Sequence, residues 1–134
     1  MHPRIKIRQK IKELLTGLEI TQDRVFTSLV SSLQDEQLPA IVIRTNNETV
    51  EEATIAGELR SLSLAIEICV KAADNFNDTA DDIALNVEDK LKQNQQLNKY
   101  WQSLKLENTE IQNNSEGETP VTSAVLNYQL LYNK

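Results

Sequence analysis

The chain has 134 residues, of which 40% are hydrophobic and 25% are charged, and its formal net charge is −6. These values are typical of one globular domain over residues 1–134 and exclude a disordered chain, while the longest apolar run is too short to cross a membrane. The acidic balance and the few aromatic residues also argue against nucleic-acid recognition, which depends on clustered Lys and Arg and on base stacking.

The N-terminal segment has the pattern of an amphipathic helix. Its apolar residues recur at helical spacing, at Ile7, Ile11, Leu14, Leu15 and Leu18. Pro3 suits the first turn of such a helix, and Gly17 favours its end. No apolar signal segment follows the first basic residues, so we expect the chain to stay in the cytoplasm where it is made.

Three strands are predicted next. Val25-Phe26 fits a short edge strand, and residues 38–44 form a β-branched run of strand length. Between them, residues 27–37 fit either one turn of helix or an irregular crossing. The third strand has the clearest period, with alternating Leu62, Leu64, Ile66, Ile68 and Val70. Burial of these side chains contributes on the order of 10 kcal/mol, at roughly 2 kcal/mol each, so we expect this strand to be central.

The second half repeats the order of helix and strands. Asn77-Asp78 favours a helix start, and Lys90 and Lys92 suit its last turn. The apolar stripe of this helix comprises Ala80, Ile83, Ala84, Val87 and Leu91. A strand from Leu104 to Ile111 and a polar turn over residues 113–118 follow. The last strand places five residues on one face: Ala124, Leu126, Tyr128, Leu130 and Tyr132.

This order of elements predicts an α+β fold. Consecutive strands joined by polar segments favour antiparallel pairing. We therefore expect a four- to five-stranded, mainly antiparallel sheet with two main helices packed on one face.

The residue types that carry catalysis are scarce. His2 is the only histidine and is expected to fray, so Cys69 has no histidine to activate it and is better explained as a small packed residue. Three glycines, Gly17, Gly57 and Gly117, cannot build a phosphate-binding loop. We expect a protein that is not an enzyme and that needs no cofactor.

Two clusters permit more than one interpretation. Asp74, Asp78, Asp81 and Asp82 suit helix capping and solvation, with weak cation binding as the alternative, because the glycine of a calcium loop is missing. We expect no dedicated metal site. The Tyr100-Trp101 pair fits a lid on the core or an interface anchor.

The segment from Thr45 to Gly57 is the strongest candidate for an interface. It is predicted to be a loop that is long for a hairpin, and loops of that length are usually functional or disordered. Its candidate contact residues are Glu48, Val50, Glu51, Glu52 and Ile55. The second candidate is a sheet face of small and mildly polar residues that another subunit can approach closely, formed by Ser61, Ser63, Ala65, Cys69, Val121, Val125 and Leu131.

Taken in order, these landmarks resemble the tail terminator proteins of long-tailed bacteriophages, the minor tail protein U family. The resemblance covers nearly the full length. It rests on the N-terminal helix, Val25-Phe26, the Leu38–Ile43 strand, the acidic segment, the Leu64–Val70 strand, the helix opened by Asp78, and the closing Ala124–Tyr132 strand.

The resemblance implies a structural protein of the virion tail, made and assembled in the host cytoplasm. Such a protein forms a hexameric ring at the head-proximal end of the tail tube, stops tube polymerisation and offers a surface for joining the head. Its partners would be other copies of itself, the tail tube protein and a head-tail connector protein. A head-tail connector or head-completion protein is the nearest alternative. A small-molecule-binding or enzymatic domain is the distant one, because it needs a pocket with convergent polar groups.

Overall fold

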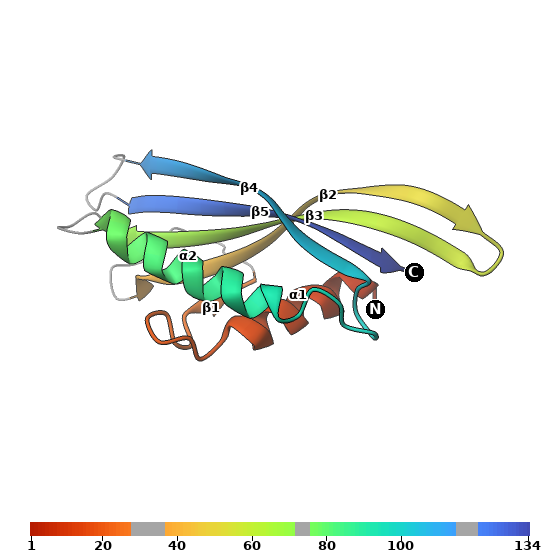
Figure 1. Ribbon diagram of the computed structural model, residues 1–134, viewed down its shortest axis with the longest axis horizontal. Helices are drawn as coiled ribbons and strands as arrows, with labels where there is room; N and C mark the ends of the chain where they lie inside the picture. Colours follow the sequence, from red (N-terminus) through yellow and green to blue (C-terminus); the bar gives the residue numbers. More distant parts are fainter. Residues whose placement is uncertain (28–36, 72–75, 115–120) are drawn as a thin grey trace.

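A five-stranded mixed sheet with two helices on one face forms the fold (Figure 1). The structure is a computed structural model that describes residues 1–27, 37–71, 76–114 and 121–134. The elements in chain order are α1 (Pro3–Leu15), β1 (Val25–Phe26), β2 (Ala40–Thr54), β3 (Gly57–Lys71), α2 (Phe76–Lys92), β4 (Ser103–Asn114) and β5 (Val121–Asn133). The strand order is β1-β2-β3-β5-β4, and β1 pairs parallel with β2 while the other pairs are antiparallel. The predicted α+β class is confirmed.

Helix α1 begins at the position that its first residues favour. Pro3 occupies the first turn, where its missing N–H costs no hydrogen bond, and the Nδ1 atom of His2 accepts a hydrogen bond from the Arg4 N–H at 3.1 Å. The prediction that His2 frays is therefore wrong, because its ring caps the helix. The helix ends before Gly17, which has a φ of +93° that favours glycine.

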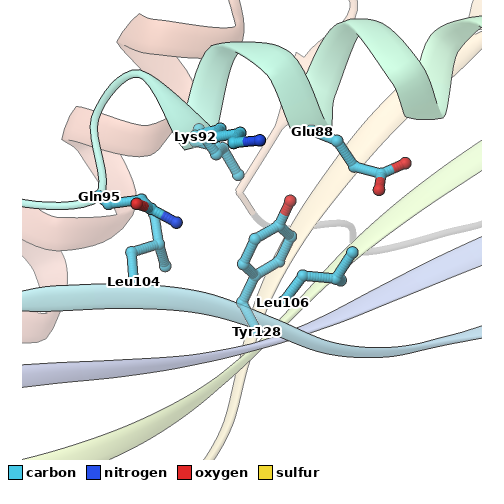
Figure 2. A pocket seen from close by; sticks show the side chains of 7 residues that line it. Glu88, Lys92, Gln95, Leu104, Leu106 and Tyr128 are labelled. Carbon is cyan, nitrogen blue, oxygen red and sulfur yellow. The ribbon is translucent and has the colours of Figure 1, made fainter.

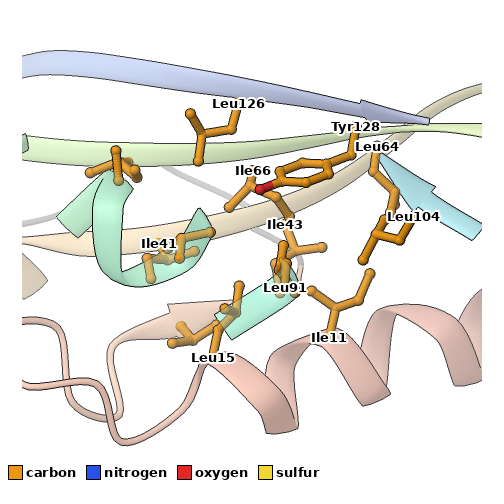
Figure 3. Close-up of a cluster of buried hydrophobic side chains, with 14 of the residues drawn as sticks. Ile11, Leu15, Ile41, Ile43, Leu64, Ile66, Leu91, Leu104, Leu126 and Tyr128 are labelled. Atoms are coloured by element: carbon orange, nitrogen blue, oxygen red, sulfur yellow. The ribbon is translucent and has the colours of Figure 1, made fainter. Parts of the chain in front are cut away.

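The core lies between the helices and the sheet (Figure 3). Strand β3 is central as predicted, with β2 on one side and β5 on the other. Ile66 is fully buried and lies opposite Ile43 of β2 and Leu126 of β5. Helix α2 covers β3, β4 and β5, while α1 packs on β1, β2 and α2. Period-2 strands and period-3.6 helices thus bury their apolar faces against one another.

The prediction of a loop from Thr45 to Gly57 is wrong. Strand β2 continues to Thr54, the turn consists of Ile55 and Ala56, and β3 starts at Gly57. This part of β2 pairs with β3 through backbone hydrogen bonds, and since most of its side chains are exposed it has no alternating apolar pattern to reveal a strand. Gly57 has a φ of +145°, and a Cβ added there would lie 2.9 Å from the Lys134 carbonyl oxygen.

Two expectations fall wholly or partly outside the described residues. The ambiguous segment over residues 27–37 includes residues 28–36, and the predicted turn over residues 113–118 includes residues 115–118, none of which the structure describes. Asn113 and Asn114 belong to the end of β4 and not to a turn.

Candidate assembly surface

The distal part of the β2–β3 hairpin projects beyond the helical layer (Figure 1). At the turn, the Ile55 side chain is fully exposed, with a relative accessibility of 109%, and Val50 on β2 is 48% exposed. Glu51 and Glu52 are exposed beside them. Four of the five predicted interface residues therefore lie together on an uncovered part of the hairpin. Large exposed apolar side chains in such a position are typical of an interaction surface.

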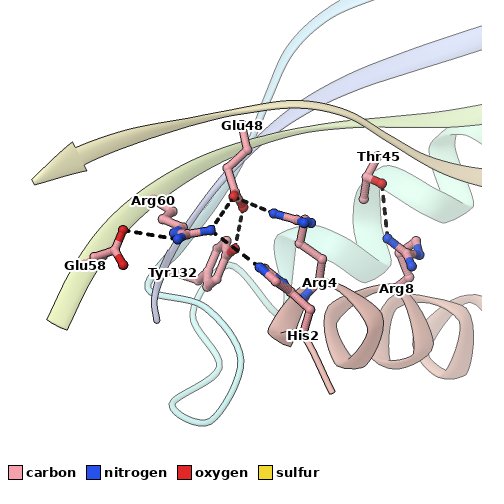
Figure 4. Close-up of polar contacts among 8 residues, drawn as sticks. All are labelled: His2, Arg4, Arg8, Thr45, Glu48, Glu58, Arg60 and Tyr132. Carbon is pink, nitrogen blue, oxygen red and sulfur yellow. Dashed lines mark hydrogen bonds and ion pairs between the residues drawn. The ribbon is translucent and has the colours of Figure 1, made fainter. Parts of the chain in front are cut away.

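Glu48, the fifth predicted residue, points inward (Figure 4). Its side chain is 11% exposed, and its Oε2 atom lies 2.6 Å from Arg4 Nη1 and 2.8 Å from Arg60 Nη1. The Tyr132 hydroxyl donates a hydrogen bond to the other carboxylate oxygen. One carboxylate thus joins α1, β2, β3 and β5, so we assign Glu48 to fixing the base of the hairpin on α1.

The groups around Glu48 have protonation states that suit these contacts. Burial and the charge of Arg4 lower the pKa of His2, so its ring is neutral at pH 7, as acceptance of the Arg4 N–H by Nδ1 requires. Burial and the hydrogen bond to Glu48 raise the pKa of Tyr132, so its hydroxyl keeps the proton that it donates. Arg60 has a second ion pair, at 3.1 Å, with Glu58.

We expect this cluster to make stability depend on pH. Burial raises the pKa of Glu48, but hydrogen bonds from Tyr132 and Arg60 and the charge of Arg4 outweigh it, so the pKa lies below its ordinary value of 4.5. The stabilisation is therefore complete above pH 4.5 and is lost as the pH falls through the lower pKa of the folded state. Urea unfolding from about pH 7 to about pH 3 should show this loss in the wild type and not in Glu48→Gln. Parallel curves for the two proteins would contradict it.

The sequence of β3 and β5 contains a signal for this cluster, which the sequence analysis did not predict. Arg60 continues the face of β3 that carries Leu62 and Leu64, and Tyr132 continues the apolar face of β5. A charged residue in line with a buried face needs a buried partner. The pattern does not reveal which acid supplies it, because Glu48 reaches this position through a bulge in β2 between Thr45 and Glu48.

A pocket of about 190 Å³ lies between α2 and β4, at the far edge of the sheet (Figure 2). Its lining residues are Glu88, Leu91, Lys92, Gln95, Leu104, Leu106 and Tyr128. Burial and the nearby Glu88 carboxylate raise the pKa of Tyr128, so its hydroxyl is neutral at pH 7. The sequence did not predict this pocket, because it forms where a helix and an edge strand meet.

The remaining candidate residues show no metal-binding arrangement in the described ranges. Cys69 is buried on β3. Asp78, Asp81 and Asp82 are exposed near the start of α2, and Asp74 lies outside the described residues. Residues 1–27, 37–71, 76–114 and 121–134 contain no group of three His, Cys, Asp or Glu side chains placed to hold a metal ion. Neither of the two described helices has the length and apolar character needed to cross a membrane.

The position of Trp101 shows that the Tyr100-Trp101 pair is part of the core and not an interface anchor. It is buried, and its Nε1 donates a hydrogen bond to the Asn94 carbonyl oxygen at 2.8 Å. Tyr100 is half-buried, and Lys10 of α1 lies 5.5 Å from the centre of its ring. The pair therefore belongs to the core, with Tyr100 packed against it, and Trp101 offers no free surface to a partner.

The small-residue face is already largely inaccessible. Ser61, Ala65 and Cys69 are buried, and the Gln129 side chain is hydrogen-bonded to both Ser61 and Ser63. Val125 and Leu131 are half-buried, while nothing is described of the Val121 side chain. The hairpin is therefore the better candidate for an assembly surface.

The comparisons with known proteins identify the family. The model of the phage minor tail protein U family matches residues 2–132, nearly the whole chain. The chain belongs to the phage minor tail protein U family. The recognition made from the ordered sequence landmarks is thus confirmed, and this minor tail protein U family member is a phage tail structural protein.

A solved structure shows the same fold. A chain in the virion of a native gene transfer agent (GTA) particle is similar with a TM-score of 0.63 and 14% sequence identity, and the match covers 94% of this chain and 95% of that chain. No curated protein matches the chain. Membership of the minor tail protein U family supports a location in the virion and assembly with other virion proteins.

Proposed function

We propose that this chain is a tail terminator. Six copies form a ring at the head-proximal end of the tail tube, block addition of the next tube ring and provide the surface to which the head-tail connector protein binds. The action is steric and needs no chemical step. Family membership supports the proposal, and the observation that carries it is the uncovered hairpin with its exposed apolar side chains.

The hairpin has the properties of an assembly contact. Its base is held by Glu48, so its orientation relative to α1 is set before a partner binds. Preorganisation of this kind reduces the entropy lost on association. Its distal part exposes Val50 and Ile55 together with Glu51 and Glu52 to a tube subunit or a neighbouring copy.

The role as a terminator predicts a change in tail length. Particles assembled without this protein should carry tubes of irregular, excessive length and few joined heads, and supplying the wild-type chain should restore both. Electron microscopy measures tube length and head attachment together. Labelled protein should lie where the tail meets the head. Tubes of normal length that fail only at head joining would instead favour the head-tail connector or head-completion protein.

We expect a double change in the hairpin to abolish assembly and leave the fold intact. Replacing Val50 and Ile55 by Ser removes exposed apolar surface, which contributes little to the core, so the thermal transition should stay near that of the wild type. Complementation by this variant should leave tube length uncontrolled. The control is Glu19→Ser, which changes an exposed residue between α1 and β1 that none of the proposed contacts uses. Normal tails from the hairpin variant would exclude this surface.

A further inference from the structure

Two long edges of the sheet are unpaired in the described chain. Strand β4 is the last strand on one side. On the other side, β1 pairs only with Ile41 and Val42, so no described strand covers the outer edge of β2 from Ile43 to Thr54. Exposed edges present free N–H and C=O groups to which another chain can add a strand.

We propose that the free edge of β2 in one copy pairs with the free edge of β4 in the next, and that Val50 fills the pocket beside β4. This inference rests on the ring proposed above and names the surfaces that close it. The two surfaces differ, so the contact is head-to-tail, which is the type of contact that generates a ring when the rotation closes.

Strand direction agrees with this pairing. Strand β2 is antiparallel to β3, β3 to β5, and β5 to β4, so β2 and β4 run in opposite directions. Rotation about a ring axis leaves the direction of each strand along that axis unchanged. Strand β2 of the next copy therefore meets β4 in antiparallel orientation, the relation that β4 already has with β5.

Val50 and the pocket also lie on the same face of the sheet, the one that the helices cover. Val50 lies opposite Arg60, which points to the helix side to reach Glu48. Leu106 lies opposite Tyr128, whose side chain lines the pocket on the helix side (Figure 2). In a sheet that continues from one copy to the next, Val50 therefore faces the side on which the pocket opens.

The pocket has the size and lining for an aliphatic side chain. Leu91, Leu104 and Leu106 supply apolar surface, and Leu106 is 37% exposed at the edge of the sheet. The pocket volume of about 190 Å³ exceeds the roughly 150 Å³ of an apolar cavity that accepts benzene. Insertion of Val50 would cover Leu106 and remove two exposed apolar side chains from water together.

Charge complementarity supports a second copy of this chain as the partner that pairs with β4 and fills its pocket. With Val50 opposite Leu106, antiparallel pairing brings Glu51, the extra residue of the β2 bulge between Val50 and Glu52, next to Lys105. Both side chains are exposed in the single chain.

The opposite charges of the two helices also favour contact between two copies. Helix α1 has five basic residues and one acid, whereas α2 has five acidic and two basic residues. Because α1 lies on the β2 side of the sheet and α2 on the β4 side, the pairing brings α1 of one copy beside α2 of the next.

A cysteine pair tests the pairing directly. In a background with the buried Cys69 replaced by Ala, we introduce Glu51→Cys and Lys105→Cys. Directly opposite residues in an antiparallel pair have Cα atoms about 4.5–5.5 Å apart, within the range of a disulfide. Oxidation should yield a ladder of covalent oligomers up to the ring on non-reducing gels. Glu51→Cys combined with Glu110→Cys is the register control and should give no ladder.

A charge exchange provides an independent measurement without cysteine. Lys105→Glu should weaken self-association about tenfold in sedimentation experiments, and adding Glu51→Lys should restore it. Lys99→Glu is the control for the loss of a positive charge elsewhere. Oligomers that form but neither cross-link nor respond to the exchange would overturn the pairing and leave the ring proposal standing. A chain that stays monomeric at all concentrations, even with tube protein, would remove both.

Discussion

Ile66→Asp is expected to unfold the chain. Ile66 is fully buried in central strand β3, and nothing among its described neighbours Ile43 and Leu126 can pair with a carboxylate. Desolvation of an unpaired charge costs several kcal/mol, in addition to the lost apolar burial, against a total stability of about 5–15 kcal/mol. Circular dichroism during heating should show no cooperative transition.

Two control variants separate this cause from a general effect of substitution in β3. Ile66→Val removes one methylene and should cost only about 0.5–1.5 kcal/mol. Ser63→Asp places a carboxylate on the opposite face of the same strand and should retain a cooperative transition. If Ile66→Asp melted near the wild-type temperature, the assignment of this face to the core would be wrong.

Trp101→Ala is expected to have the second-largest effect, a loss of about 3–5 kcal/mol of stability. The indole is buried in the core, and its removal leaves a cavity and an unpaired Asn94 carbonyl. The chemical denaturation midpoint should fall without a large change in slope.

This change also tests whether the aromatic pair belongs to the core or to an interface. Tyr100→Ala removes the half-buried neighbour and should cost much less stability. An interface anchor would show the opposite pattern, with a stable monomer that fails to assemble. A Trp101→Ala monomer of unchanged stability with defective tails would therefore reverse the assignment.

The structure gives the three acidic residues of the hairpin two different roles. In the sequence, Glu48, Glu51 and Glu52 look alike, because all three lie in one polar segment. In the fold, Glu48 is bound by Arg4, Arg60 and Tyr132, while Glu51 and Glu52 face solvent. One acid therefore orients the hairpin, and the other two are free to contact a partner.

The sequence by itself determined the order of the elements, the α+β class and the core. Its apolar residues recur with a period of 2 in β3 and β5 and with helical spacing in α1 and α2, and burial of one face is what produces those periods. The order of landmarks also sufficed to recognise the family.

Only the tertiary structure decided the features that depend on contacts between distant segments. The distal half of β2 has no buried face, so its strand exists through backbone pairing with β3, which leaves no period in the sequence. The cluster around Glu48 joins residues as far apart as Arg4 and Tyr132. The pocket beside β4 likewise depends on how α2 lies across an edge strand. The local sequence pattern predicts which side chains are buried. The residue that each buried side chain contacts depends on how the whole chain packs.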